Sequence, residues 1–142
     1  MLRTPASVAT SLALFLPGVA SAATLTVGPA RTYPTITAAV TAASSGDTIQ
    51  VDAGQYRESL DITKDLVFIG VGGSAQVEIR GTNTAIRIVD AKVEFHGFEV
   101  TNTTTGQGFN LDSDADVLLE DVYVHDQNNT GTVVNRKRGP TK

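Results

Sequence analysis

The stretch Val93–Asn102, which reads VEFHGFEVTN, returns one repeat later as Val117–Asp126, which reads VLLEDVYVHD. Four apolar positions of the two stretches coincide at an offset of 24: Val93 with Val117, Phe95 with Leu119, Phe98 with Val122, and Val100 with Val124. Apolar and polar residues alternate as in a β-strand, so Val93 and Phe95 are expected to face away from Glu94 and His96. A strand pattern repeated at this length predicts a solenoid, because one coil cannot bury its own apolar face.

Shorter segments of the same kind precede this repeat and are bounded by Gly, Asp, Asn or Ser. We expect strands at residues 24–27, 48–51, 60–62, 66–70, 77–79 and 85–88. Leu66 and Phe68 match Val93 and Phe95 at an offset of 27, so the coil length drifts from 27 to 24 along the chain. The sequence therefore predicts an all-β fold, a right-handed parallel β-helix of about four coils.

One helix is expected, at about residues 35–44, as a cap over the N-terminal end of the stack. Four apolar residues fall at the i, i+3, i+4 and i+7 spacing of one helix face: Ile36, Ala39, Val40 and Ala43. Thr35 is the expected N-cap, and Gly46 lies just beyond the C-terminal end.

Residues 1–22 have the pattern of a secretory signal peptide. Arg3 supplies the positive region, Val8–Leu16 is almost entirely small or apolar, and Ala20-Ser21-Ala22 is a small-x-small cleavage site. The apolar run is shorter than the roughly 20 residues that a membrane span needs. We expect cleavage near Ala22 and Ala23, a protein that is secreted (extracellular or periplasmic), and no membrane span after cleavage; a buried N-terminal helix is the alternative.

The remaining chain is expected to form one β-helix domain at residues 23–134, followed by a basic disordered tail at residues 135–142. Loss of Arg3 changes the net charge from −4 to −5, which argues against nucleic acid as a partner. No cysteine is present, so disulfides contribute nothing to stability. No C-terminal cap is recognisable. We therefore expect either further coils in a longer chain or another chain on that end, including end-to-end self-association.

The run Tyr33–Glu58 resembles the N-terminal cap and first coil of right-handed parallel β-helix proteins of the pectin lyase-like superfamily. That superfamily includes pectate lyases, pectin methylesterases and many secreted carbohydrate-active or surface proteins. The resemblance implies the fold, a place outside the cell, and an acidic polysaccharide as the partner to test.

Pectin methylesterases are the nearest enzymatic comparison. Gly54–Glu58 matches their G-x-Y-x-E motif, and Gln107–Leu111 keeps the first and last residues of Q-A-V-A-L. Of the family's Q-D-T-L motif only Gln127 remains, because Asn128 stands where the acid/base Asp would be. The resemblance implies that Gln107 and Gln127 bind substrate. An amide cannot exchange a proton as a carboxylic acid does, and the nucleophile motif is absent, so we predict no catalytic residue.

Two further sets of side chains bear on metal binding. Asp112, Asp114 and Asp116 alternate, so in an extended segment their carboxylates share a face and are candidate Ca²⁺ ligands. A solvated acidic corner is the alternative, and no other cofactor is predicted. His96 and His125 are separated by more than one coil and are expected to point outward into solvent rather than to form a metal pair.

Two functions are consistent with these patterns. The first is a non-catalytic structural or carbohydrate-contacting module on the outside of the cell, related to polysaccharide-active enzymes but truncated. The alternative is a pectin-active enzyme of the methylesterase or lyase type, with Gln107 and the aspartates at 112, 114 and 116 as its residual site.

Overall fold

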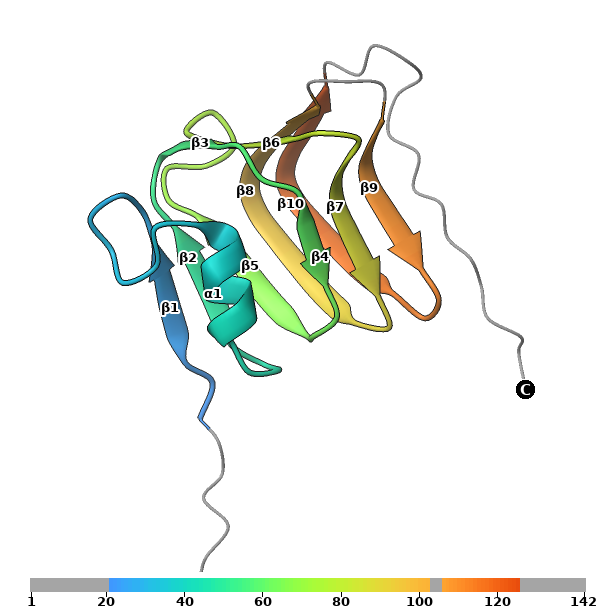
Figure 1. The fold of residues 1–142 in the computed structure, drawn as a ribbon, viewed down its shortest axis with the longest axis horizontal. Coiled ribbons are helices and arrows are strands. Elements are labelled where there is room, and N and C mark those ends of the chain that lie inside the picture. Colours follow the sequence, from blue (N-terminus) through green and yellow to red (C-terminus); the bar gives the residue numbers. More distant parts are fainter. Residues whose placement is uncertain (1–20, 103–105, 126–142) are drawn as a thin grey trace, which may run out of the picture.

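The computed structural model describes residues 21–102 and 106–125 and shows a parallel β-solenoid of about four turns (Figure 1). Among the described residues there is one short helix, near the N-terminal end of this stack, as expected. Within the described ranges, no helix is both long enough and apolar enough to cross a membrane. Most of the predicted signal peptide, Gln127 and the basic tail at 135–142 lie outside the described residues.

The strands of the described chain are short, and every pair between them is parallel. In chain order the elements are β1 (Thr24–Val27), α1 (Ile36–Ala42), β2 (Thr48–Val51), β3 (Gly54–Tyr56), β4 (Leu60–Ile62), β5 (Leu66–Gly70), β6 (Val77–Gly81), β7 (Thr84–Val89), β8 (Lys92–Asn102), β9 (Gln107–Asp112) and β10 (Asp116–His125). Of these, β3 and β9 were not expected from the sequence.

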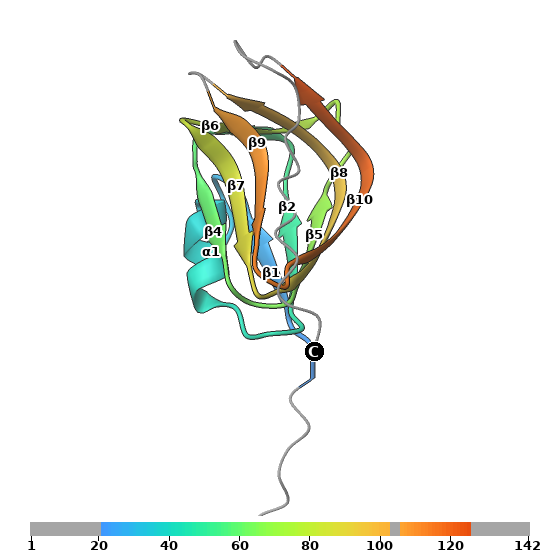
Figure 2. The same ribbon diagram turned by 90° about the vertical axis from the view of Figure 1, so that its right-hand side faces the viewer.

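The strands form three faces of the solenoid, as the end-on view shows (Figure 2). On the first face, β1, β2, β5 and the first half of β8 pair in that order. On the second face, β3, β6 and the second half of β8 pair in that order. Strand β10 pairs along nearly the whole length of β8. The third face is a separate sheet with the order β4-β7-β9. The long strands β8 and β10 thus each run along two faces. In earlier coils, separate strands form these two faces.

The register of the strands confirms both repeat lengths expected from the sequence. Leu66 pairs with Val93, an offset of 27, and Val93 pairs with Val117, an offset of 24. Because neighbouring strands lie about 4.8 Å apart, each apolar side chain rests on its counterpart in the next coil.

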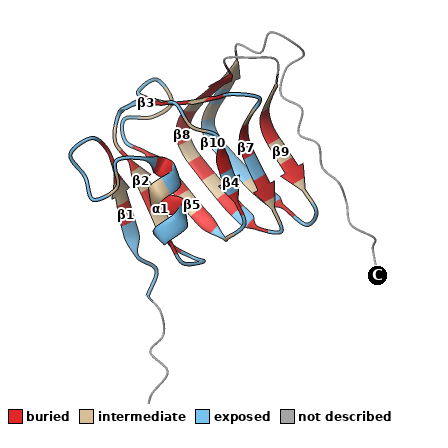
Figure 3. Cartoon of the chain, viewed as in Figure 1, coloured by how far each residue is buried: buried red, intermediate tan, exposed pale blue. Residues whose placement is uncertain are grey.

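Stacked aromatic rings lie at the centre of the core. The rings of Phe68 and Phe95 are parallel within 6°, with centroids 4.5 Å apart. Phe98 and Phe109 each meet Phe95 edge-on at 5.6 Å. All four rings are at most 1% exposed. Buried positions, coloured red, recur along the strands of the stack (Figure 3). The coils are therefore held together by an apolar column that runs through the stack.

A bend at Gly97 lets β8 turn from one face to the next. Gly97 has a φ of +78°, and its counterpart Asp121 has a φ of +51°. In a regular strand, residues three apart point to opposite faces. The bend at Gly97 shifts this alternation by one residue, so Phe95 and Phe98 both point inward. The Asp121 carboxylate accepts hydrogen bonds from the Ser74 backbone N–H at 3.0 Å and the Ser74 hydroxyl at 2.9 Å. The corner is thus tied to a loop 47 residues earlier in the chain.

Side chains from the following coil hold both ends of α1. The Glu58 carboxylate accepts hydrogen bonds from the backbone N–H groups of Ile36 at 2.9 Å and Thr37 at 2.8 Å. At the other end, Lys64 Nζ donates to the carbonyl groups of Val40, Thr41 and Ala43. These contacts satisfy terminal backbone groups of the helix and fix it against the first coil.

Strand β10 is the last strand of the described stack, and its apolar residues are poorly covered. Leu118 is 51% exposed, Leu119 37% and Tyr123 62%. By contrast Phe95, which pairs with Leu119 from β8, is fully buried. Leu118 and Tyr123 pair with the outward-facing Glu94 and Glu99, so of these three only Leu119 lies over a core residue. A further coil or another chain on this end stays a prediction.

Replacement of Phe95 by Ala tests the aromatic column. The change removes contacts with three rings and leaves a cavity, so the free energy of unfolding should fall by about 3–5 kcal/mol. Urea unfolding measures this value. Leu118→Ala, at an exposed site in β10, is the control and should change it by at most about 0.5 kcal/mol. A loss below about 1 kcal/mol for Phe95→Ala would contradict the packing described.

Candidate functional site

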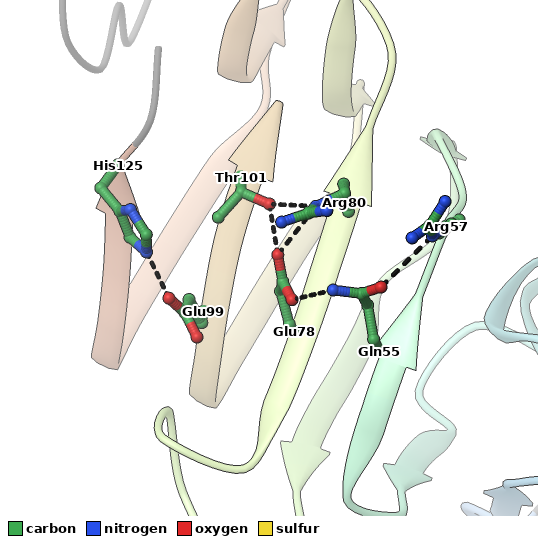
Figure 4. A network of polar contacts seen from close by, with 7 residues as sticks. All are labelled: Gln55, Arg57, Glu78, Arg80, Glu99, Thr101 and His125. Atoms are coloured by element: carbon green, nitrogen blue, oxygen red, sulfur yellow. Dashed lines mark hydrogen bonds and ion pairs between the residues drawn. The ribbon is translucent and has the colours of Figure 1, made fainter. Parts of the chain in front are cut away.

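Two rows of polar side chains run across the outward face of β3, β6, β8 and β10. We call them together the polar ladder: Gln55, Glu78 and Glu99 in one row, and Arg57, Arg80, Thr101 and His125 in the other (Figure 4). The intervening residues Tyr56, Ile79 and Val100 point inward and are buried. The alternation of each strand therefore places one residue in the core and the next on the ladder.

Glu78 is the centre of the hydrogen-bond network in the ladder. Its carboxylate accepts from Gln55 Nε2 at 2.5 Å and from the Thr101 hydroxyl at 2.7 Å. Arg80 Nε donates to the same carboxylate at 3.1 Å, and Arg57 Nε donates to Gln55 Oε1 at 3.2 Å. The network joins successive coils through side chains alone (Figure 4).

These contacts set the charge state of Glu78. Partial burial acts to raise the pKa of Glu78, but hydrogen bonds from Gln55 and Thr101 and the nearby charge of Arg80 lower it overall. The side chain is only 18% exposed. Glu78 therefore stays ionised at neutral pH and acts as an acceptor of hydrogen bonds rather than as a proton donor.

Beside the ladder is a hollow of about 240 Å³ lined by Arg57, Glu58, Ser59, Arg80 and Thr82. In the described part of the chain, the two arginines use only Nε in hydrogen bonds, so their terminal nitrogens are available to a ligand. Glu58 is already bound to the N-terminus of α1. The hollow thus presents two guanidinium groups and two hydroxyl-bearing residues.

The residues taken from the pectin methylesterase comparison do not lie in this hollow. Gln107 begins β9, in the other sheet, and its backbone carbonyl accepts a hydrogen bond from Asn102 Nδ2 at 2.8 Å. Gln127 lies outside the described residues. A substrate-binding role for these two glutamines stays a prediction.

The three aspartates do not share one extended face, contrary to the premise of the calcium hypothesis. Residues 113–114 form a turn between β9 and β10, and Ser113 has a φ of +54°. Asp112 contacts Arg87 at 3.1 Å, whereas Asp116 begins β10 opposite Lys92. Among residues 21–102 and 106–125, no group of three or more acidic, His or Cys side chains is arranged to hold a metal ion. Calcium binding stays a prediction.

Both histidines point outward, as expected, but each contacts a carboxylate instead of solvent alone. His96 Nδ1 lies 2.9 Å from Glu120 Oε2, and His125 Nε2 contacts Glu99. Stacking of the coils in register brings these acidic side chains within reach. His125 is thereby part of the polar ladder (Figure 4).

The pH dependence of stability tests the role of Glu78. Because the folded-state pKa of Glu78 is lowered, its ionised contacts stabilise the protein at neutral pH, and this contribution is lost as the pH falls below about 4.5. Glu78→Gln should therefore be less stable than the wild type at pH 7, and the difference should shrink on acidification. Denaturant unfolding at a series of pH values measures this. Asp61→Asn, at a side chain 75% exposed, is the control; an equal pH-dependent difference there would contradict the assignment to Glu78.

Comparison with known proteins adds no identification: no family model matches the chain, and neither the curated proteins nor the solved structures gave a match.

Proposed function

We propose that this protein is a secreted, non-catalytic module of the pectin lyase-like β-helix type that contacts an acidic polysaccharide through the polar ladder. The observation that supports this most is the hollow lined by Arg57 and Arg80, whose terminal nitrogens have no partner in the described chain. A planar guanidinium group matches a carboxylate in a bidentate geometry, and this pairing is stronger than a neutral hydrogen bond.

The surroundings of the hollow suit a sugar acid better than a small inorganic anion. The Thr82 hydroxyl can exchange hydrogen bonds with sugar hydroxyl groups. The Ser59 hydroxyl already donates to the Thr82 carbonyl at 3.2 Å, and its oxygen can accept a further hydrogen bond. The one carboxylate that lines the hollow, that of Glu58, is occupied by the backbone of α1. A uronic acid would offer its carboxylate to the arginines and its hydroxyls to these neighbours.

The ladder also repeats along the solenoid, which favours a polymer as the ligand. Its members recur at the spacing of adjacent strands, about 4.8 Å, over several coils. On the last described strand, Tyr123 is 62% exposed, and its ring centroid lies 4.7 Å from that of His125. An exposed aromatic ring of this kind provides an apolar surface for a sugar ring. An extended chain could therefore contact successive coils at once.

The same geometry supports a binding role over an enzymatic one. A general acid or base works best when its pKa lies near the operating pH. The pKa of Glu78 is moved away from neutrality, because three side chains donate hydrogen bonds to its ionised form. The ladder therefore suits recognition of hydroxyl groups and charge.

Calorimetric titration with oligogalacturonate tests the proposal. Arg57→Gln should weaken binding roughly tenfold, because one charge-assisted hydrogen-bonding group is lost. Added salt should weaken wild-type binding, since part of the attraction is Coulombic. The matched control is Arg87→Gln on β7, an arginine of the other sheet that pairs with Asp61 and Asp112.

Three results would contradict this function. They are the absence of heat with the wild type, an equal loss of affinity in Arg87→Gln, and equal binding of a neutral oligosaccharide of the same length. Release of methanol or of unsaturated sugars from pectin by the wild type would replace the binding role with the enzymatic alternative.

A further inference from the structure

Ala23 is fixed in the fold through both of its backbone polar groups. Its N–H donates a hydrogen bond to Asp47 Oδ1 at 2.8 Å, and its carbonyl accepts one from the Thr48 N–H at 2.8 Å. The next residue, Thr24, begins β1 and pairs with Thr48 of β2. Ala23 is therefore the point at which the chain joins the first coil.

Asp47 is a buried carboxylate with donors on both oxygens. The residue is only 7% exposed, and its second oxygen accepts from the Ser44 N–H at 2.8 Å. Hydrogen bonds from the backbone of Ala23 and Ser44 lower the pKa of Asp47 despite its desolvation, and the charge of Lys64 lowers it further. Asp47 is thus a negative charge at neutral pH. It is also the only charged residue among those that line the hollow beside Ala23, all of which are described.

The peptide bond before Ala23 is the bond that the sequence marks for cleavage. Ala20-Ser21-Ala22 has the small-x-small pattern that exporting peptidases recognise. Hydrolysis there consumes one water molecule and leaves a carboxylate on Ala22. The released amine of Ala23 takes up a proton and is an α-ammonium group at neutral pH.

We propose that cleavage between Ala22 and Ala23 completes the fold, because the new α-ammonium group of Ala23 forms an ion pair with Asp47. The neutral N–H donor of the precursor becomes a charged one at the same place, 2.8 Å from Asp47 Oδ1. Charge-assisted hydrogen bonds are roughly twice as strong as neutral ones. The ion pair fastens β1 to the turn before β2, and β1 is the outermost strand of its sheet.

The position of the cleavage matters to within one residue. If Ala22 were retained, the charge would move by about 3.8 Å, the spacing of successive Cα atoms, and the donor to Asp47 would remain a neutral amide. If Ala23 were lost, the bonds to Asp47 and Thr48 would both disappear. Only a chain that begins at Ala23 places its terminal charge on Asp47.

The first test is the N-terminus of the full chain after export from a secreting host, determined by intact mass. The expected product begins at Ala23, and any other N-terminus overturns the proposal.

The second test compares the chain that begins at Ala23 with one that keeps Ala22, each with Asp47 or with Asp47→Asn. The chain that begins at Ala23 should have the higher melting temperature with Asp47 present. The difference should disappear in Asp47→Asn. An equal difference in both backgrounds, or none with Asp47 present, overturns the proposal.

A third measurement does not depend on the folding of Asp47→Asn. In the chain that begins at Ala23, the pKa of the α-amine, followed by NMR, should lie above the ordinary value of such a group. The charged groups near it are Asp47, which raises this pKa, and Lys64, which opposes it. The stabilisation is then fully present at neutral pH and is lost as the pH rises through the raised pKa. An unshifted or lowered pKa would overturn the ion pair.

Discussion

Every coil of this solenoid buries its inward side chains only by resting on the coils before and after it. The Phe68 and Phe95 rings, stacked at 4.5 Å, are the clearest instance. Because this contact fixes the register of the backbone, it also fixes the rows on the outside. Gln55 lies over Glu78, and Glu78 over Glu99, since Tyr56, Ile79 and Val100 beside them must stack in the core. The polar ladder is thus a consequence of how the apolar residues pack.

The G-x-Y-x-E motif shows how a resemblance can indicate a fold without indicating an activity. Gly54 has a φ of +155°, and the buried Tyr56 donates a hydrogen bond from its hydroxyl to the Asp52 carbonyl at 2.9 Å. Glu58 caps α1 through two backbone N–H groups. Each residue fixed by the motif therefore has a structural role where the cap meets the first coil. A motif of this kind can be shared by proteins with different chemistry or none.

The sequence predicted the features that depend on regular periodicity and missed those that depend on corners. The offsets of 27 and 24 and the helix near 35–44 follow from apolar spacing, and the structure confirms them. The ladder was missed because its members recur at unequal offsets, 23 from Gln55 to Glu78 but 21 from Arg80 to Thr101. The aspartates were expected on one extended face, but the chain turns at Ser113. Loop lengths between strands decide both outcomes, and no local pattern encodes them.

The acidity of the chain is compatible with an acidic ligand, because many of its carboxylates are occupied by the fold itself. At several corners a carboxylate accepts hydrogen bonds from backbone N–H groups of another coil: Asp47 from Ala23, Glu58 from Ile36 and Thr37, Asp65 from Lys92, Asp90 from Asp114, and Asp121 from Ser74. Such contacts satisfy backbone donors that irregular corners would leave unpaired. The negative charge is therefore used at the corners, whereas Arg57 and Arg80 keep their terminal nitrogens free of partners in the described chain. Net charge is therefore a poor guide to the ligand of a solenoid. Only the charged groups that are not bonded to the protein's own backbone are available to contact a ligand.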